Sequence, residues 1–162
     1  DSEEAAGAYA HAFSRQNGST ALILSRQDLP MINEIPVQTR REGVLKGAYI
    51  ARKETQPLER IIIATGSELL LALKAADSLG YGTRVVSMPC MEAFERQSAE
   101  YKESVLPSSC QNRTAVEAGV SLSWGKYAKK FVCTDDFGFS ADGSEIYKHF
   151  GLTAENVANV AK

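Results

Sequence analysis

The apolar positions of this chain are organised around one stretch, from Leu58 to Pro89. The run Ile61 to Ala64 is short and largely β-branched, which is typical of a strand buried on both faces. Apolar residues then recur every three or four positions from Leu69 to Leu79, as on one face of an amphipathic helix. Glycines end that pattern, and a second strand-like run covers residues 83–88. The stretch predicts a strand–helix–strand crossover with parallel strands and a right-handed connection.

The second half of the chain repeats this alternation of strand and helix patterns. Strands are predicted at Arg113–Glu117 and Phe131–Thr134. Helices are predicted over residues 90–97, 98–105, 122–128 and 144–150, and from a cap at Thr153 to the end of the chain. We therefore expect an α/β fold, a three-layer sandwich whose mainly parallel sheet is built from strand–helix–strand crossovers.

The first 30 residues predict a separate helix and strand, the remnant of a preceding α/β domain. Residues 3–16 form a helical pattern with acidic residues in its first turn and an apolar face that includes Tyr9 and Phe13, and Thr20 to Ser25 is strand-like. Residues 31–43 show little periodicity and are interpreted as a linker, in which Arg40 and Arg41 are solvated charges. The predicted divisions are residues 1–30, 31–43 and 44–162.

The turn from Thr65 to Glu68 permits two interpretations. Thr65 and Glu68 have the spacing of a capping box, and Gly66 permits a tight strand-to-helix turn. A helix N-terminus can also bind phosphate, but this spacing fits neither the dinucleotide pattern nor the P-loop. Because Glu68 would place a carboxylate beside any bound anion, the sequence favours a structural turn.

Composition narrows the classes of function. The chain has 162 residues, 44% of them hydrophobic, and a formal net charge of −2, which argues against a nucleic-acid-binding protein. No apolar run approaches the roughly 20 residues that span a bilayer, so no membrane partner is expected. The start of the chain has neither the features of a secretory signal nor a methionine, which we interpret as a piece of a longer protein.

The cysteines and histidines give no sign of a metal site. The three cysteines are widely spaced, without a Cys-x-x-Cys motif, and this pattern favours free thiols in a reducing compartment. We accordingly expect a cytoplasmic location. His11 and His149 lie far apart in the sequence and are not placed beside the cysteines.

Two further groups could carry chemistry. Arg26 directly follows the predicted strand at Thr20–Ser25, where open α/β sheets place ligand-contacting groups, and a guanidinium suits phosphate recognition. From chemistry alone a surface or structural role is the commoner one for an arginine. Asp135 and Asp136 are paired carboxylates, but neighbouring residues of an extended chain point to opposite faces, so solvated loop charges are favoured.

Several motifs resemble transketolase in the order that family has them. Residues 62–68 and 84–89 resemble the start of its third domain, and the resemblance continues through residues 103–107, 115–119 and 137–141. Residues 20–27 look like the end of its middle, pyrimidine-binding domain. After Ser140 and Ala141 the family often has a proline where this chain has Asp142, so the entry to the next helix should differ locally.

The resemblance implies an enzyme of the pentose phosphate pathway that transfers a two-carbon ketol unit between ketose and aldose phosphates. It implies thiamine diphosphate and Mg²⁺ as cofactors of a homodimeric parent enzyme, both bound by segments that this chain lacks. In that family the arginine of the Ser-Arg-Gln motif binds the substrate's phosphate, and here that position is Arg26. Asp28 stands where the motif more often has asparagine and adds a negative charge.

No catalytic residue, cofactor ligand or metal ligand is transferred to this chain by the resemblance, so the chain alone is expected to be non-catalytic. Two alternatives stay open. One is the third domain of another thiamine enzyme, such as deoxyxylulose-phosphate synthase or a 2-oxoacid dehydrogenase β subunit. The other is a freestanding regulatory or nucleotide-binding module. The motifs at residues 25–27 and 87–90 favour transketolase over the related thiamine enzymes.

Overall fold

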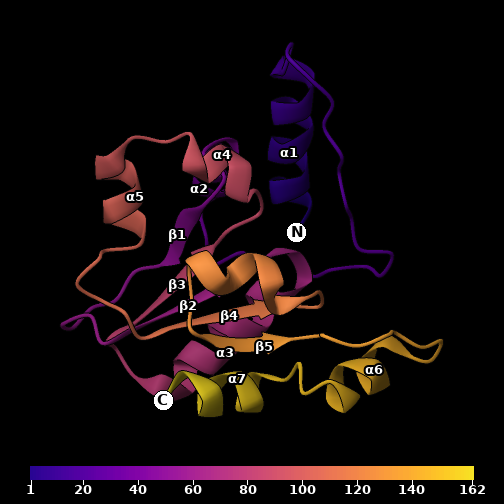
Figure 1. Ribbon diagram of the computed structural model, residues 1–162, viewed down its shortest axis with the longest axis vertical. Helices are drawn as coiled ribbons and strands as arrows, with labels where there is room; N and C mark the ends of the chain where they lie inside the picture. Colours follow the sequence, from indigo (N-terminus) through magenta and orange to yellow (C-terminus); the bar gives the residue numbers. More distant parts are fainter.

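The computed structural model describes all residues, 1–162, and has one five-stranded sheet at its centre (Figure 1). The strand order is β1-β3-β2-β4-β5, and β1 runs antiparallel to β3 while the other neighbours are parallel. The strands are β1 (Tyr49–Arg52), β2 (Arg60–Ala64), β3 (Thr83–Ser87), β4 (Arg113–Glu117) and β5 (Lys130–Cys133). The parallel pairing of β2 with β3 confirms the predicted crossover.

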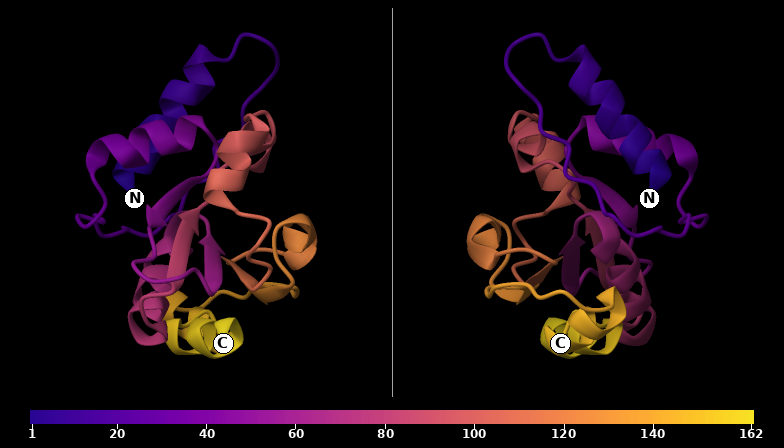
Figure 2. Two further views of the ribbon diagram at one scale, coloured as in Figure 1. Left: turned by 90° about the vertical axis from the view of Figure 1, so that its left-hand side faces the viewer. Right: turned by 90° about the vertical axis from the view of Figure 1, so that its right-hand side faces the viewer.

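Helices cover both faces of this sheet (Figures 1 and 2). One face carries α3 (Leu69–Leu79), α6 (Gly143–His149) and α7 (Ala154–Ala161), and the other carries α4 (Met91–Glu95), α5 (Ala99–Val105) and the 3₁₀ helix η2 (Ser121–Lys126). The remaining helices are α1 (Ser2–Ser14), α2 (Val37–Leu45) and the 3₁₀ turn η1 (Gly66–Glu68). The three-layer α/β architecture is confirmed, and none of the helices is both long and apolar enough to cross a bilayer.

The central strand β2 separates two apolar cores. Ile61 and Ile63 pack with Phe94 and Trp124 on the α4–α5 face of the sheet. Ile62 packs on the opposite face, in the cluster that contains residues of α3 and α7. All three isoleucines are fully buried, as the sequence predicted for this strand.

The predicted helix starts at Ser98 and Thr153 are also confirmed. The Ser98 side chain accepts a hydrogen bond from Tyr101 N at the start of α5 (3.2 Å), and this cap separates α5 from α4. Thr153 accepts from Asn156 N in the same way at the start of α7 (3.2 Å). Each cap satisfies a backbone donor that the first turn of a helix leaves free.

The predicted strand at Thr20–Ser25 is wrong in this structure. The segment between α1 and α2 belongs to no helix or strand until Val37. A strand requires a neighbouring strand for its backbone hydrogen bonds, and no other segment of the chain pairs with these residues. An extended apolar run is therefore present without the sheet that would complete it.

The segment interpreted as a linker is partly helical and partly buried. α2 lies within and just beyond it, and the prediction that Arg40 is solvated is wrong, because Arg40 is only 1% exposed. Its guanidinium forms an ion pair with the Asp1 carboxylate, which also accepts a hydrogen bond from Ile32 N (2.9 Å). Because the partner of Arg40 is remote in sequence, no local pattern predicts that Arg40 is buried. Arg41, in contrast, is exposed and pairs with Glu3.

Helix α1 packs against α2 through its smaller, more polar side. Gly7 permits the close approach, because a Cβ at this position would lie 2.8 Å from the Arg41 carbonyl oxygen. Glu4 is buried and accepts hydrogen bonds from Tyr49 Oη (2.9 Å) and Ser87 Oγ (2.6 Å), and burial, followed by the charge of Glu4, raises the pKa of Tyr49 well above its usual value. The predicted apolar face of α1 is exposed to solvent, since Tyr9 is 45% and Phe13 is 85% exposed.

The first prediction concerns the central strand. Ile62→Ala should lower the free energy of unfolding by about 2–5 kcal/mol, because it removes a fully buried aliphatic side chain from a packed core. Denaturant melts of the two proteins measure this difference. A loss below about 1 kcal/mol would contradict the central position of Ile62.

A second prediction concerns the pH dependence of stability. Arg84 donates two hydrogen bonds to Glu54 (2.7 and 2.6 Å) and two more to the Ser104 and Val105 carbonyl oxygens. The bonds from Arg84 hold the pKa of Glu54 below its usual 4.5. The stabilisation is therefore complete above the unfolded-state pKa and is lost as the pH falls through the lower folded-state pKa.

Glu54→Gln should lower the free energy of unfolding by about 1–3 kcal/mol at neutral pH. It should also make the loss of stability on acidification less steep. Urea melts at stepped pH values measure both effects. An acid limb of the same steepness in the variant would show that other carboxylates cause the acid sensitivity.

Candidate functional site

Arg26 lies on the loop that follows the extended segment 20–25. Its side chain is exposed and forms no ion pair within the chain. Asp28, two residues further on, is exposed too and does not pair with Arg26. The planar guanidinium therefore keeps all its donors available to an anion, and its geometry suits two-point contact with a carboxylate or a phosphate.

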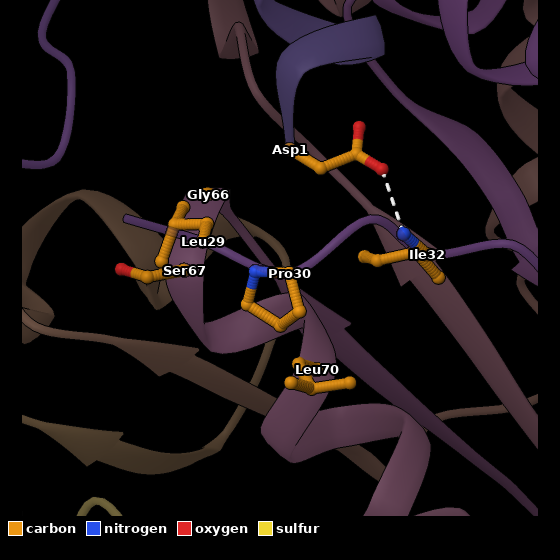
Figure 3. Close-up of a pocket in the computed structure, with 7 residues that line it drawn as sticks. All are labelled: Asp1, Leu29, Pro30, Ile32, Gly66, Ser67 and Leu70. Carbon is orange, nitrogen blue, oxygen red and sulfur yellow. Dashed lines mark hydrogen bonds between the residues drawn. The ribbon is translucent and has the colours of Figure 1, made fainter. Parts of the chain in front are cut away.

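The loop after Arg26 lies against the carboxyl end of strand β2. Leu29, Pro30 and Ile32 face Gly66, Ser67 and Leu70 of the β2–α3 turn across a cavity of about 40 Å³, with the Pro30 ring above Leu70 (Figure 3). Gln27 lies beside Gly143, the first residue of α6. The structure thus places the loop that follows the sequence-predicted arginine at the carboxyl edge of the sheet, where open α/β folds commonly bind ligands.

The adjoining crevice of the sheet is already filled. Between β2 and β4 the connections leave in opposite directions, so this is the topological switch point at which such sheets commonly bind ligands. Glu68, only 3% exposed, accepts hydrogen bonds there from Ala118 N (3.0 Å) and Ser67 Oγ (2.6 Å). Tyr147 Oη also donates to the Glu68 carboxylate. A buried carboxylate occupies the place where a phosphate or nucleotide would approach.

The predicted capping box does not form. Thr65 makes no side-chain cap, and Glu68 reaches across to the backbone that follows β4 instead of back to its own turn. The prediction of a structural turn rather than a phosphate loop is consistent with this arrangement, although the partners of Glu68 are not those that the local spacing indicated. Burial, followed by the hydrogen bond to Glu68, raises the pKa of Tyr147 to about 12.

Other groups near this edge do not converge on a reaction centre. Asp135 and Asp136 are exposed, and the hydrogen bond from Ser121 N lowers the pKa of Asp135. No three His, Cys, Asp or Glu side chains come together in a way that could hold a metal ion. All three cysteines are free thiols, and burial raises the pKa of Cys133 to about 11, which keeps it protonated at neutral pH and a poor nucleophile.

Sequence reasoning missed the Glu68–Tyr147 contact. The two residues are 79 positions apart, and the sequence pattern indicates only that Tyr147 is an apolar position of a short helix. A glutamate in the turn after a buried strand was the one available signal. Its partner could not be named without the tertiary structure, which brings Tyr147 of α6 to the turn after β2.

The comparisons with known proteins agree with one another. Residues 47–153 match the family model described as the transketolase-like TK C-terminal domain. The transketolase of Physarum polycephalum is 52% identical over 164 residues, which is 99% of this chain and 25% of the relative. The transketolase of Dictyostelium discoideum is 50% identical over 165 residues, again 25% of its length. The chain thus spans about a quarter of the length of the curated relatives it matches.

Solved structures give the same result. Transketolase from Leishmania mexicana superposes with a TM-score of 0.89 and 39% identity, covering 99% of this chain and 24% of that one. A transketolase from Pichia stipitis in complex with sedoheptulose-7-phosphate has a TM-score of 0.88 and 35% identity, covering 99% and 23%. The similarity therefore includes the first 30 residues as well as the sheet.

A third prediction concerns the Glu68 carboxylate that fills the crevice. Glu68→Ala should cost about 1–3 kcal/mol, because it leaves the Ala118 N–H and the Tyr147 hydroxyl without their acceptor. The pKa of Tyr147 should also fall from about 12 while staying above its ordinary value, since burial is the larger cause. Denaturant melts measure the first effect and ultraviolet titration of the tyrosines the second. In a Tyr147→Phe background, Glu68→Ala should leave the tyrosine titration unchanged, and an equal change there would assign the signal to another tyrosine.

Proposed function

The chain belongs to the transketolase family, and from this premise we propose that it forms the C-terminal quarter of a transketolase. The parent enzyme would transfer a two-carbon ketol unit from a ketose phosphate to an aldose phosphate, within the pentose phosphate pathway. Support comes from the family match at residues 47–153. It also comes from two transketolases that align with 99% and 100% of this chain but with only 25% of their own length.

We assign residues 1–30 to the end of the middle, pyrimidine-binding domain, residues 31–43 to a linker and residues 44–162 to the C-terminal domain. The support is the surface of the first 30 residues. Phe13 is 85%, Ile23 is 96% and Leu24 is 54% exposed, and the extended run that carries the last two has no partner strand. Such a face is expected of a piece whose own domain continues in residues outside this chain.

Thiamine diphosphate and Mg²⁺ would be bound by other parts of a homodimeric parent enzyme. A diphosphate–magnesium site needs converging oxygen ligands, and the residues of this chain provide no such group. At the switch point, the carboxylate of Glu68 would repel a phosphate. When bound elsewhere in the enzyme, the cofactor supplies the carbanion chemistry, and this chain alone would be non-catalytic. The three free thiols are consistent with a cytoplasmic location.

The contribution of this chain to substrate binding would be Arg26. We propose that its guanidinium binds the phosphate of the sugar substrate. One relative, the Pichia stipitis transketolase, has been solved in complex with the sugar phosphate sedoheptulose-7-phosphate. The observation that carries this role is that Arg26 is exposed and forms no internal ion pair, while the loop that follows it lies against the turn at the carboxyl end of β2. The alternative of a freestanding nucleotide-binding module is not favoured, because the crevice such a module would use is filled by Glu68.

Arg26→Ala in the full-length enzyme tests this function. The phosphate lies far from the bond that breaks, so the substitution should raise KM more than it lowers kcat. A charge-assisted contact of this kind is worth on the order of 1.5–3 kcal/mol, so kcat/KM for a phosphorylated donor should fall roughly ten- to more than a hundredfold. Arg26→Lys should recover only part of the loss, because an ammonium lacks the planar fork.

The control is a donor without phosphate, such as hydroxypyruvate. Its turnover should scarcely respond to either substitution. Equal losses with phosphorylated and unphosphorylated donors would show that Arg26 supports the fold or a subunit contact, and its assignment as a substrate residue would be wrong.

A further inference from the structure

We propose that the C-terminal domain serves the reaction by positioning Arg26, and that Gly143 and Leu70 are the positioning residues. This inference rests on the proposed phosphate-binding role of Arg26. It assigns a task in substrate binding to two residues of the C-terminal domain. Three contacts of the loop that follows Arg26 support it.

The first contact is an anchor in the core. Ile32 and Ile35 are 5% and 2% exposed, and both belong to the apolar cluster that includes Leu69 and Leu73 of α3. Six residues after Arg26 the chain is therefore fixed to the body of the C-terminal domain. The hydrogen bond from Ile32 N to Asp1 (2.9 Å) holds the same point from the side of α1.

The second contact lies between this anchor and Arg26. Pro30 lies over the β2–α3 turn, beside Ser67 and above Leu70, as Figure 3 shows. The ring of a proline fixes its own φ and restricts the residue before it, so this part of the loop has little conformational freedom. Leu70 supplies the apolar surface beneath the ring.

The third contact is made by the neighbour of Arg26. A Cβ added at Gly143 would lie 3.4 Å from Gln27 Nε2, so Gln27 rests directly on the first residue of α6. The Asp142 side chain caps the start of α6 by accepting a hydrogen bond from Ser144 N (2.8 Å). A side chain larger than a methyl group at Gly143 would meet the end of the Gln27 side chain, and we expect the resulting strain to reach the adjacent Arg26.

Together these contacts explain how an exposed arginine without internal partners can still bind well. A free loop loses conformational freedom when its ligand binds, whereas a loop that is already held in place binds at a lower cost. Misplacement of a binding group by about 1 Å can reduce activity by as much as a hundredfold. The C-terminal domain thus supplies a rigid support on which the Arg26 loop lies.

The test compares two glycine substitutions in the full-length enzyme. Gly143→Leu should raise KM for a phosphorylated donor by about three- to tenfold with kcat within about twofold, and hydroxypyruvate turnover should not change. Gly138→Leu is the matched control, because it adds the same side chain to the neighbouring loop where a Cβ meets nothing within 4 Å. It should leave both donors unaffected.

A double-mutant cycle shows whether Gly143 acts through Arg26. In an Arg26→Ala background, Gly143→Leu should have no further effect on the phosphorylated donor, because the group it displaces is gone. Full additivity would overturn the positioning role. If thermal melts show that Gly143→Leu does not fold, Leu70→Ala takes its place, with the same selective rise in KM expected.

The outcomes separate the two proposals. If Arg26→Ala affects both kinds of donor equally, the proposed function itself is wrong. If Arg26→Ala is selective for the phosphorylated donor but Gly143→Leu and Leu70→Ala both leave its KM unchanged, only the positioning role is overturned.

Discussion

The structure depends on the burial of β2 on both faces. Ile61 and Ile63 on one side and Ile62 on the other require a layer of helices over each face of the sheet, and α3 and the α4–α5 pair provide them. Because the chain leaves β2 through α3 to reach β3 and later places β4 on the opposite side, the same constraint creates a switch point at the carboxyl end of β2. The ligand-binding geometry of the fold is therefore a consequence of how its core is closed.

In this chain the switch point is used for structure. Glu68 joins the turn after β2 to the backbone after β4 and to Tyr147 on α6, so the crevice is closed by the protein's own carboxylate. Under the proposed function, phosphate binding would fall to the segment that lies over this edge, where Arg26 is exposed and the following loop is anchored by Ile32. On this proposal, the C-terminal domain would influence substrate binding through the loop that it supports.

The sequence by itself determined several features that depend only on neighbouring residues. The three- and four-residue spacing of apolar positions gave α3, the β-branched run gave β2, and the hydroxyl side chain of Thr153 marked a helix start that the structure confirms. The motifs also gave the family. Periodicity and capping are properties of a few consecutive residues, so they can be recognised without knowledge of the fold.

Only the tertiary structure decided which residues are paired across the chain. Arg40 is buried against Asp1, 39 positions away, and Glu68 bonds to Ala118 and Tyr147 at separations of 50 and 79. The same is true of Thr20–Ser25, an extended run that has no partner strand to make it part of a sheet. A charged side chain is buried, or an extended run becomes a strand, only when a partner lies beside it, and that proximity follows from the topology rather than from the local sequence.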